Sequence, residues 1–147
     1  MATRRAREVR APSALLAAAT GLVLSACGVG SGTLRVGDAE AALVGAAGAV
    51  VTALALDVPP PAPGLREPCT LPTGEAGLRS RVDVRAPGSA TAMVLEAAAA
   101  ALVAEGFLIV DPGVPDTVLG QREGLSLSLA EDGGVLELDG LTGCRPR

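Results

Sequence analysis

The apolar positions of the chain first recur with a helical period between Ala39 and Leu56. They fall on one helix face, and they are Leu43, Val44, Ala47, Val50, Val51 and Leu54. The spacing predicts an amphipathic helix. The uncharged run Ala41–Leu56 has only 16 residues, fewer than the roughly 17–25 that a membrane span needs. A helix covered by the rest of its domain is therefore expected rather than a transmembrane one.

A second helix is predicted over Ala90–Glu105, where apolar residues again recur every three to four positions. Ser89 is the expected N-terminal cap because its side-chain oxygen can accept from a free backbone N–H. Gly106 fits the left-handed position that ends many helices, and Phe107 would then return to contact Leu102.

Strand patterns occupy most of the remaining chain. Leu78–Ala86 alternates strictly, with apolar or small residues on one face and Arg79, Arg81, Asp83 and Arg85 on the other. Such alternation is typical of a half-buried strand. Phe107–Asp111 and Thr117–Glu123 are shorter strand candidates, separated by a Pro- and Gly-containing break.

The two best strands are Leu125–Ala130 and Val135–Gly140, and their patterns predict a hairpin. A four-residue loop over 131–134 would pair Ala130 with Val135 and set the apolar residues of both strands on one face. The preceding turn at Glu123-Gly124 leaves open which face of Thr117–Glu123 points inward.

The segment 57–77 is rich in Pro and Gly and reads as an extended, turn-rich connector. The predicted order is thus helix, strand, helix and four further strands. Strands with one apolar and one polar face indicate helices on one side only. The expected fold class is α+β: a single small domain over 38–147, with a four- to five-stranded, mostly antiparallel sheet and two helices on one face.

The N-terminus has the features of an export signal. Four Arg residues precede the uncharged run Ala14–Leu24, whose eleven residues are too few to span a bilayer. The run ends at Leu24-Ser25-Ala26-Cys27, which resembles the lipobox of bacterial lipoproteins. An ordinary signal peptide with a nearby Cys is the alternative, and the export route, general secretory or twin-arginine, stays open.

The resemblance implies that the Cys27 thiol is lipidated and that residues 1–26 are removed as a signal peptide. Residues 27–37, which begin with a Gly-rich run, would then be a flexible tether. The layout of the whole chain also resembles small cell-envelope lipoproteins of actinobacteria. The expected location is the outer face of the cell membrane, with the lipid on Cys27 as the anchor.

Composition and charge exclude several functions. The chain has no His, Trp, Tyr or Lys, so His-dependent nucleophiles, His-ligated metals and Schiff bases cannot form. Without residues 1–26, eight Arg and fifteen acidic residues give a net charge of −7, which argues against nucleic acid as a partner. Neither a cofactor nor a metal is expected, and catalysis is not expected.

Lipidation of Cys27 would leave Cys69 and Cys144 as an even pair in an exported chain, where disulfides persist. Cys69 precedes the first predicted strand and Cys144 follows the last. A disulfide between them is expected, and two free thiols or a metal site are the alternatives.

The remaining candidate site is the polar face of the sheet. Its charged residues are Arg79, Arg81, Arg85, Glu137 and Asp139. They form either a solvated surface or the binding face for an envelope protein or wall component. The expected function is a membrane-anchored, non-enzymatic binding or adaptor module. The alternative is a carrier or sensor of an apolar ligand held between sheet and helices, for which a continuous apolar cavity would be required.

Overall fold

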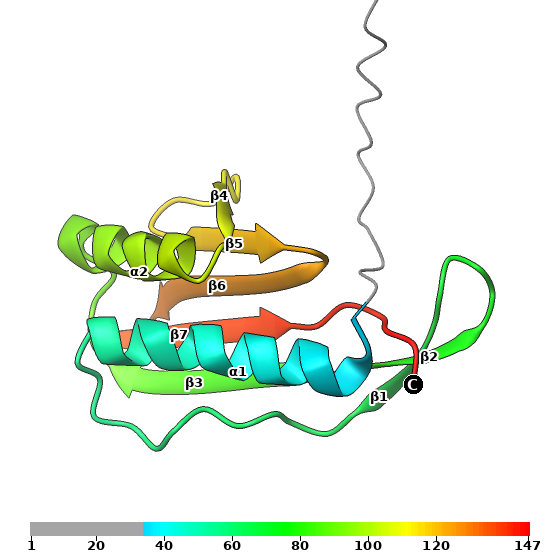
Figure 1. Cartoon of the computed structure of the whole chain (residues 1–147). Helices are drawn as coiled ribbons and strands as arrows, with labels where there is room; N and C mark the ends of the chain where they lie inside the picture. The colour runs from blue at the N-terminus through cyan, green and yellow to red at the C-terminus, as the bar shows by residue number, and fades with distance from the viewer. Residues whose placement is uncertain (1–33) are drawn as a thin grey trace, which may run out of the picture.

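The computed structural model describes residues 34–147. Two helices and seven strands follow one another along the chain, with both helices on the same side of the main sheet (Figure 1). They are α1 (Val36–Ala53), β1 (Glu67–Thr70), β2 (Ala76–Arg79), β3 (Arg81–Pro87), α2 (Ala92–Ala104), β4 (Leu108–Val110), β5 (Val118–Arg122), β6 (Leu125–Asp132) and β7 (Val135–Leu141).

The main sheet has five strands in the order β3-β7-β6-β5-β4, and every neighbouring pair is antiparallel. The last four strands form a meander, and β7 closes it against β3. The predicted α+β class, the single domain and the helices on one face are confirmed.

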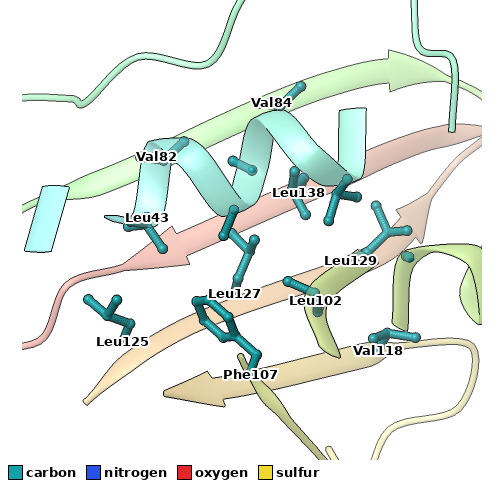
Figure 2. Packing of buried hydrophobic residues seen from close by; sticks show 14 of the residues in the cluster. Leu43, Val82, Val84, Leu102, Phe107, Val118, Leu125, Leu127, Leu129 and Leu138 are labelled. Carbon is teal, nitrogen blue, oxygen red and sulfur yellow. The ribbon is translucent and has the colours of Figure 1, made fainter. Parts of the chain in front are cut away.

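The core lies between the sheet and the helices (Figure 2). α1 buries Leu43, Ala47 and Val50 against the inner faces of β3, β6 and β7. α2 contributes Leu102, which lies beside Phe107 over β5. Although α1 is long and apolar enough to cross a membrane, seven of its residues, Glu40 among them, are buried within this domain.

Of the two predicted ends of α2, the structure differs at the N-terminus and agrees at the C-terminus. Ser89 as the cap is wrong: the helix begins at Ala92, and the Thr91 hydroxyl accepts from the Val94 N–H at 3.4 Å. The predicted C-terminus is confirmed. Gly106 is left-handed with φ 81°, and the Phe107 N–H donates to the Leu102 carbonyl at 2.9 Å.

The β6–β7 hairpin exists, but the predicted loop and pairing are wrong. The turn has two residues, Gly133 and Gly134, with φ of 59° and 84°, and it pairs Asp132 with Val135. Two consecutive positive φ angles match the twist of antiparallel strands, so this short turn is favoured over a four-residue loop. The register differs by two residues, an even shift, and the apolar face was therefore assigned correctly.

The β5–β6 turn is also a two-residue turn with two positive φ angles, 47° at Glu123 and 75° at Gly124. It pairs Arg122 with Leu125. Val118 and Gly120 consequently face the core, and Leu119 faces outward. This settles the orientation that the sequence left open.

The C-terminal part of the predicted connector 57–77 contains strands. β1 and β2 form a separate antiparallel two-stranded ribbon, where a loop was expected. The predicted continuous strand Leu78–Ala86 is interrupted at buried Ser80, whose N–H donates to the Thr142 hydroxyl at 2.9 Å. On one side of this break the chain pairs with β1, and on the other it pairs with β7.

Candidate interaction surface

The predicted lipidation site, Cys27, lies outside the described residues. The described chain starts at Leu34, and the Val36 N–H donates to the Pro146 carbonyl at 3.2 Å. The start of α1 therefore lies beside the C-terminal tail, at one end of the domain (Figure 1).

The predicted disulfide between Cys69 and Cys144 is present. It joins β1 to the C-terminal tail, with a Cα–Cα distance of 5.9 Å and a sequence separation of 75. The tail also pairs with β2, since Leu78 and Arg145 exchange backbone hydrogen bonds of 2.8 Å in both directions. The bond thus links the ribbon to the end of the main sheet.

The predicted partner residues are brought together except for one. Arg81 and Asp139 lie on β3 and β7, where two guanidinium hydrogen bonds of 2.8 and 2.6 Å join them. Further along the same two strands, Arg85 of β3 pairs with Glu137 of β7 at 3.0 Å. Arg79 instead lies on β2 and pairs with Glu67 of β1 at 2.9 Å.

These pairs make the outer face of β3 and β7 polar but nearly balanced in charge. Arg81 lies between Asp139 and Asp83, and the hydrogen bonds that its guanidinium donates to Asp139 raise its pKa. On the neighbouring strand β6, the half-exposed Ser126 and Ser128 carry no charge. Since neither helix covers this side, the face formed by Arg81, Asp83, Arg85, Glu137 and Asp139 is open to a partner; we call it the sheet face.

The helices pack directly on the sheet at two glycines, Gly120 and Gly140. A Cβ added at Gly140 would lie 2.7 Å from Leu127 Cδ1 and 3.0 Å from Leu43 Cδ1, and one at Gly120 would lie 3.1 Å from Leu102 Cδ1. These glycines face the two helices, so each helix already touches the sheet backbone. Such contact is that of a close-packed core and does not favour the apolar-ligand alternative.

Arg145 is a feature that sequence reasoning missed. Its side chain is fully buried; its Nε donates to the Thr142 carbonyl at 2.6 Å, and Nη2 donates to the Glu123 carbonyl. Burial lowers the pKa of Arg145. The sequence gives no sign that Arg145 is buried. Its partners are backbone carbonyls of Thr142 and Glu123, and every residue has such a carbonyl, so no residue type identifies them.

A surface groove of about 560 Å³ opens at the N-terminal end of α2. Its walls carry Asp116, Glu131 and three hydroxyl side chains. Glu131 accepts from the Ala90 N–H at 2.8 Å, and nearby Asp111 accepts from the Gly113 N–H at 2.8 Å. Asp111 therefore holds its own turn, as acidic turn residues commonly do, and Glu131 on β6 fixes the segment that precedes α2.

Within residues 34–147 no group of three or more Cys, Asp or Glu side chains is placed to hold a metal ion. No protein-family model, curated protein or solved structure matches the chain. Function is therefore inferred from the surfaces of this domain and from the N-terminal sequence.

Proposed function

We propose that the protein is a membrane-anchored envelope lipoprotein that acts as a non-enzymatic binding module. Lipid on Cys27 holds it at the outer face of the cell membrane, and the sheet face binds an envelope protein or wall component. The binding role is supported by the polar sheet face, which neither helix covers, together with the close contact of both helices with the sheet at Gly120 and Gly140.

The distance from anchor to domain supports this arrangement. From Cys27 to Leu34 the chain advances seven residues, which reach at most about 25 Å when fully extended. A lipid on Cys27 would therefore keep the domain close to the bilayer. Two or three acyl chains give stable attachment, whereas one gives only marginal binding.

The polar character of the sheet face supports recognition rather than catalysis. Its charged side chains pair with one another at 2.6–3.2 Å, and exposed pairs of this kind contribute little to stability. A partner with complementary charges can replace them at small cost, and such contacts govern association rate and specificity.

The experiment is site-directed photo-crosslinking in the native membrane. A photoreactive residue replaces Ser128 beside the sheet face, and in a matched control it replaces Gly45, an exposed residue on α1. The proposal predicts a discrete adduct from position 128 and none of the same mass from position 45.

A charge-swapped variant, Arg81→Asp with Asp139→Arg, adds a second readout. It keeps the ion pair and the net charge but reverses their positions, so the fold should persist while the position-128 adduct weakens. An unchanged adduct in this variant, or equal adducts from both positions, would contradict the sheet face as the binding surface.

A further inference from the structure

The two edges of the five-stranded sheet are protected to very different degrees. At the β3 edge, the connector runs alongside, and the Gly64 N–H donates to the Arg81 carbonyl at 2.7 Å. Along β3, exposed charged side chains alternate with buried apolar ones. Charges and a covering segment are the usual means by which proteins prevent unwanted pairing at a sheet edge. The β3 edge therefore has ordinary protection.

The opposite edge, β4, carries no charged side chain and, within residues 34–147, has no covering segment, so only its length of three residues limits pairing there. In the described part of the chain β4 pairs only with β5, and all three of its residues are aliphatic. Leu108 is 74% exposed and Ile109 is 42% exposed, and they point to opposite sides of the sheet. Because alternate residues of an edge strand direct their N–H and C=O groups away from the sheet, β4 also offers free backbone groups.

Exposed apolar residues are concentrated in the stretch of chain that contains β4. Of the seven large hydrophobic residues that are exposed in the described chain, five lie between positions 93 and 114. These are Met93 and Val103 on α2, Leu108 and Ile109 on β4, and Val114 in the following loop. We call this set the β4 edge. An edge strand with exposed aliphatic side chains, within a segment that exposes further apolar residues, has the features of an interaction site.

The charges around the β4 edge specify its occupant. From 92 to 117 the chain contains four acidic residues, among them Glu105 and Asp111 on either side of β4, and no Arg. The nearest cation is Arg122, which donates to the Glu105 carbonyl and lies over the Phe107 ring. A second copy would place two sets of acidic residues side by side, which is unfavourable. A segment with basic ends is complementary.

We propose that β4 accepts an extended, apolar segment of another protein as a sixth strand, with basic residues at the ends of that segment. Backbone hydrogen bonds would supply affinity, and the alternating side chains would contact Leu108 on one side of the sheet and Ile109 on the other. This surface is distinct from the sheet face, and the proposal does not depend on lipidation of Cys27.

The test uses the full chain in mild detergent and the fluorescent peptide Arg-Val-Thr-Val-Thr-Val-Arg. One control peptide has Pro at the central Val, which removes a ladder hydrogen bond; another has Glu at both ends. Anisotropy should show binding of the Arg-ended peptide, at least about fivefold weaker binding of the Glu-ended peptide, and loss of binding with Pro. Amide exchange of residues 108–110 should slow when the Arg-ended peptide binds.

Variants locate the binding at the edge. Leu108→Lys should weaken binding of the Arg-ended peptide by about tenfold or more, because a charge on an edge strand opposes pairing. Leu65→Lys, at a connector residue that is 91% exposed, adds the same charge elsewhere and should leave binding unchanged. The exchange measurement uses the unaltered chain, so it does not depend on how Leu108→Lys folds.

Three results would overturn the proposal. One is no binding of the Arg-ended peptide at about 1 mM, a weak affinity for a protein interaction. Another is equal binding of the Pro-containing peptide, which would show that strand addition is not involved. The third is self-association that Leu108→Lys abolishes in the absence of peptide, which would identify a second copy as the occupant.

Discussion

The Glu40 carboxylate on α1 accepts two hydrogen bonds from the Arg66 guanidinium, at 2.9 Å from Nε and 2.6 Å from Nη2. Glu40 is buried, whereas Arg66 is half-exposed at the end of the connector. Arg66 lowers the pKa of Glu40 below its ordinary value of 4.5, against the opposing effect of burial. The pair thereby fixes the returning connector to the start of α1.

This pair predicts a specific loss of stability in acid. A carboxylate with a lowered pKa stabilises the fold fully above its ordinary value of 4.5, and that contribution disappears as the pH falls through the lowered pKa. Arg66→Met should therefore lower the urea midpoint at neutral pH. It should also make the urea midpoint fall less between neutral and acidic pH than it does in the unaltered chain, because the contribution of the Glu40–Arg66 pair is already absent.

Arg79→Met is the matched control for Arg66→Met, because the Arg79–Glu67 pair is exposed on both sides and such pairs contribute little. Urea unfolding of both variants at about pH 7 and about pH 3.5 measures the difference. Equal effects of the two substitutions at both pH values would contradict the role given to Glu40.

The disulfide predicts a large and non-additive effect on stability. Cys69→Ser and Cys144→Ser should each lower the free energy of unfolding by about 4 kcal/mol, because the bond closes a long loop in the unfolded chain. The double variant should be no less stable than either single one. Chemical denaturation of the three variants checks this, and additive losses would mean that the two thiols act separately.

Two glycines distinguish a filled interior from a hollow one. Gly140→Ala places a Cβ 2.7 Å from Leu127 and should destabilise the fold by about 1–3 kcal/mol through overpacking. Gly45→Ala, on the exposed side of α1 with no neighbour within 4 Å, should stabilise it by about 0.5–1 kcal/mol.

Thermal unfolding of the two glycine variants gives the comparison. A Gly140→Ala protein as stable as the unaltered chain would show that the methyl groups of Leu127 and Leu43 can move aside, which requires space beneath α1. That result would restore the apolar-ligand alternative.

The sequence predicted the layers of the fold well because burial repeats along each element. The period along α1 and the alternation along β3 identify the inward residues Leu43, Val50, Val82 and Val84 without knowledge of the partners. The even shift of the β6–β7 register shows the limit of this information, since alternation defines a face but not a position along it.

Features that depend on contacts between distant segments could not be predicted. The Cys69–Cys144 bond was predicted from the cysteine count, but the ribbon of β1 and β2 and its pairing with the tail at Arg145 were not, because no local pattern encodes the contact between Leu78 and Arg145. The sheet face was predicted from alternation on β3 and β7, yet Arg79 departs from it because the chain breaks at Ser80. The exposure of Leu108 follows only from the edge position of β4.

Attachment of the binding module through Cys27 can be measured by mass spectrometry of the protein extracted from the membrane fraction of its own cells. We expect a mature chain that begins at Cys27 and carries two or three acyl chains on that residue. In the Cys27→Ser variant the signal should stay uncut and the lipid mass should be absent. Recovery of the unaltered protein in the aqueous fraction, with an unmodified Cys27, would contradict this attachment.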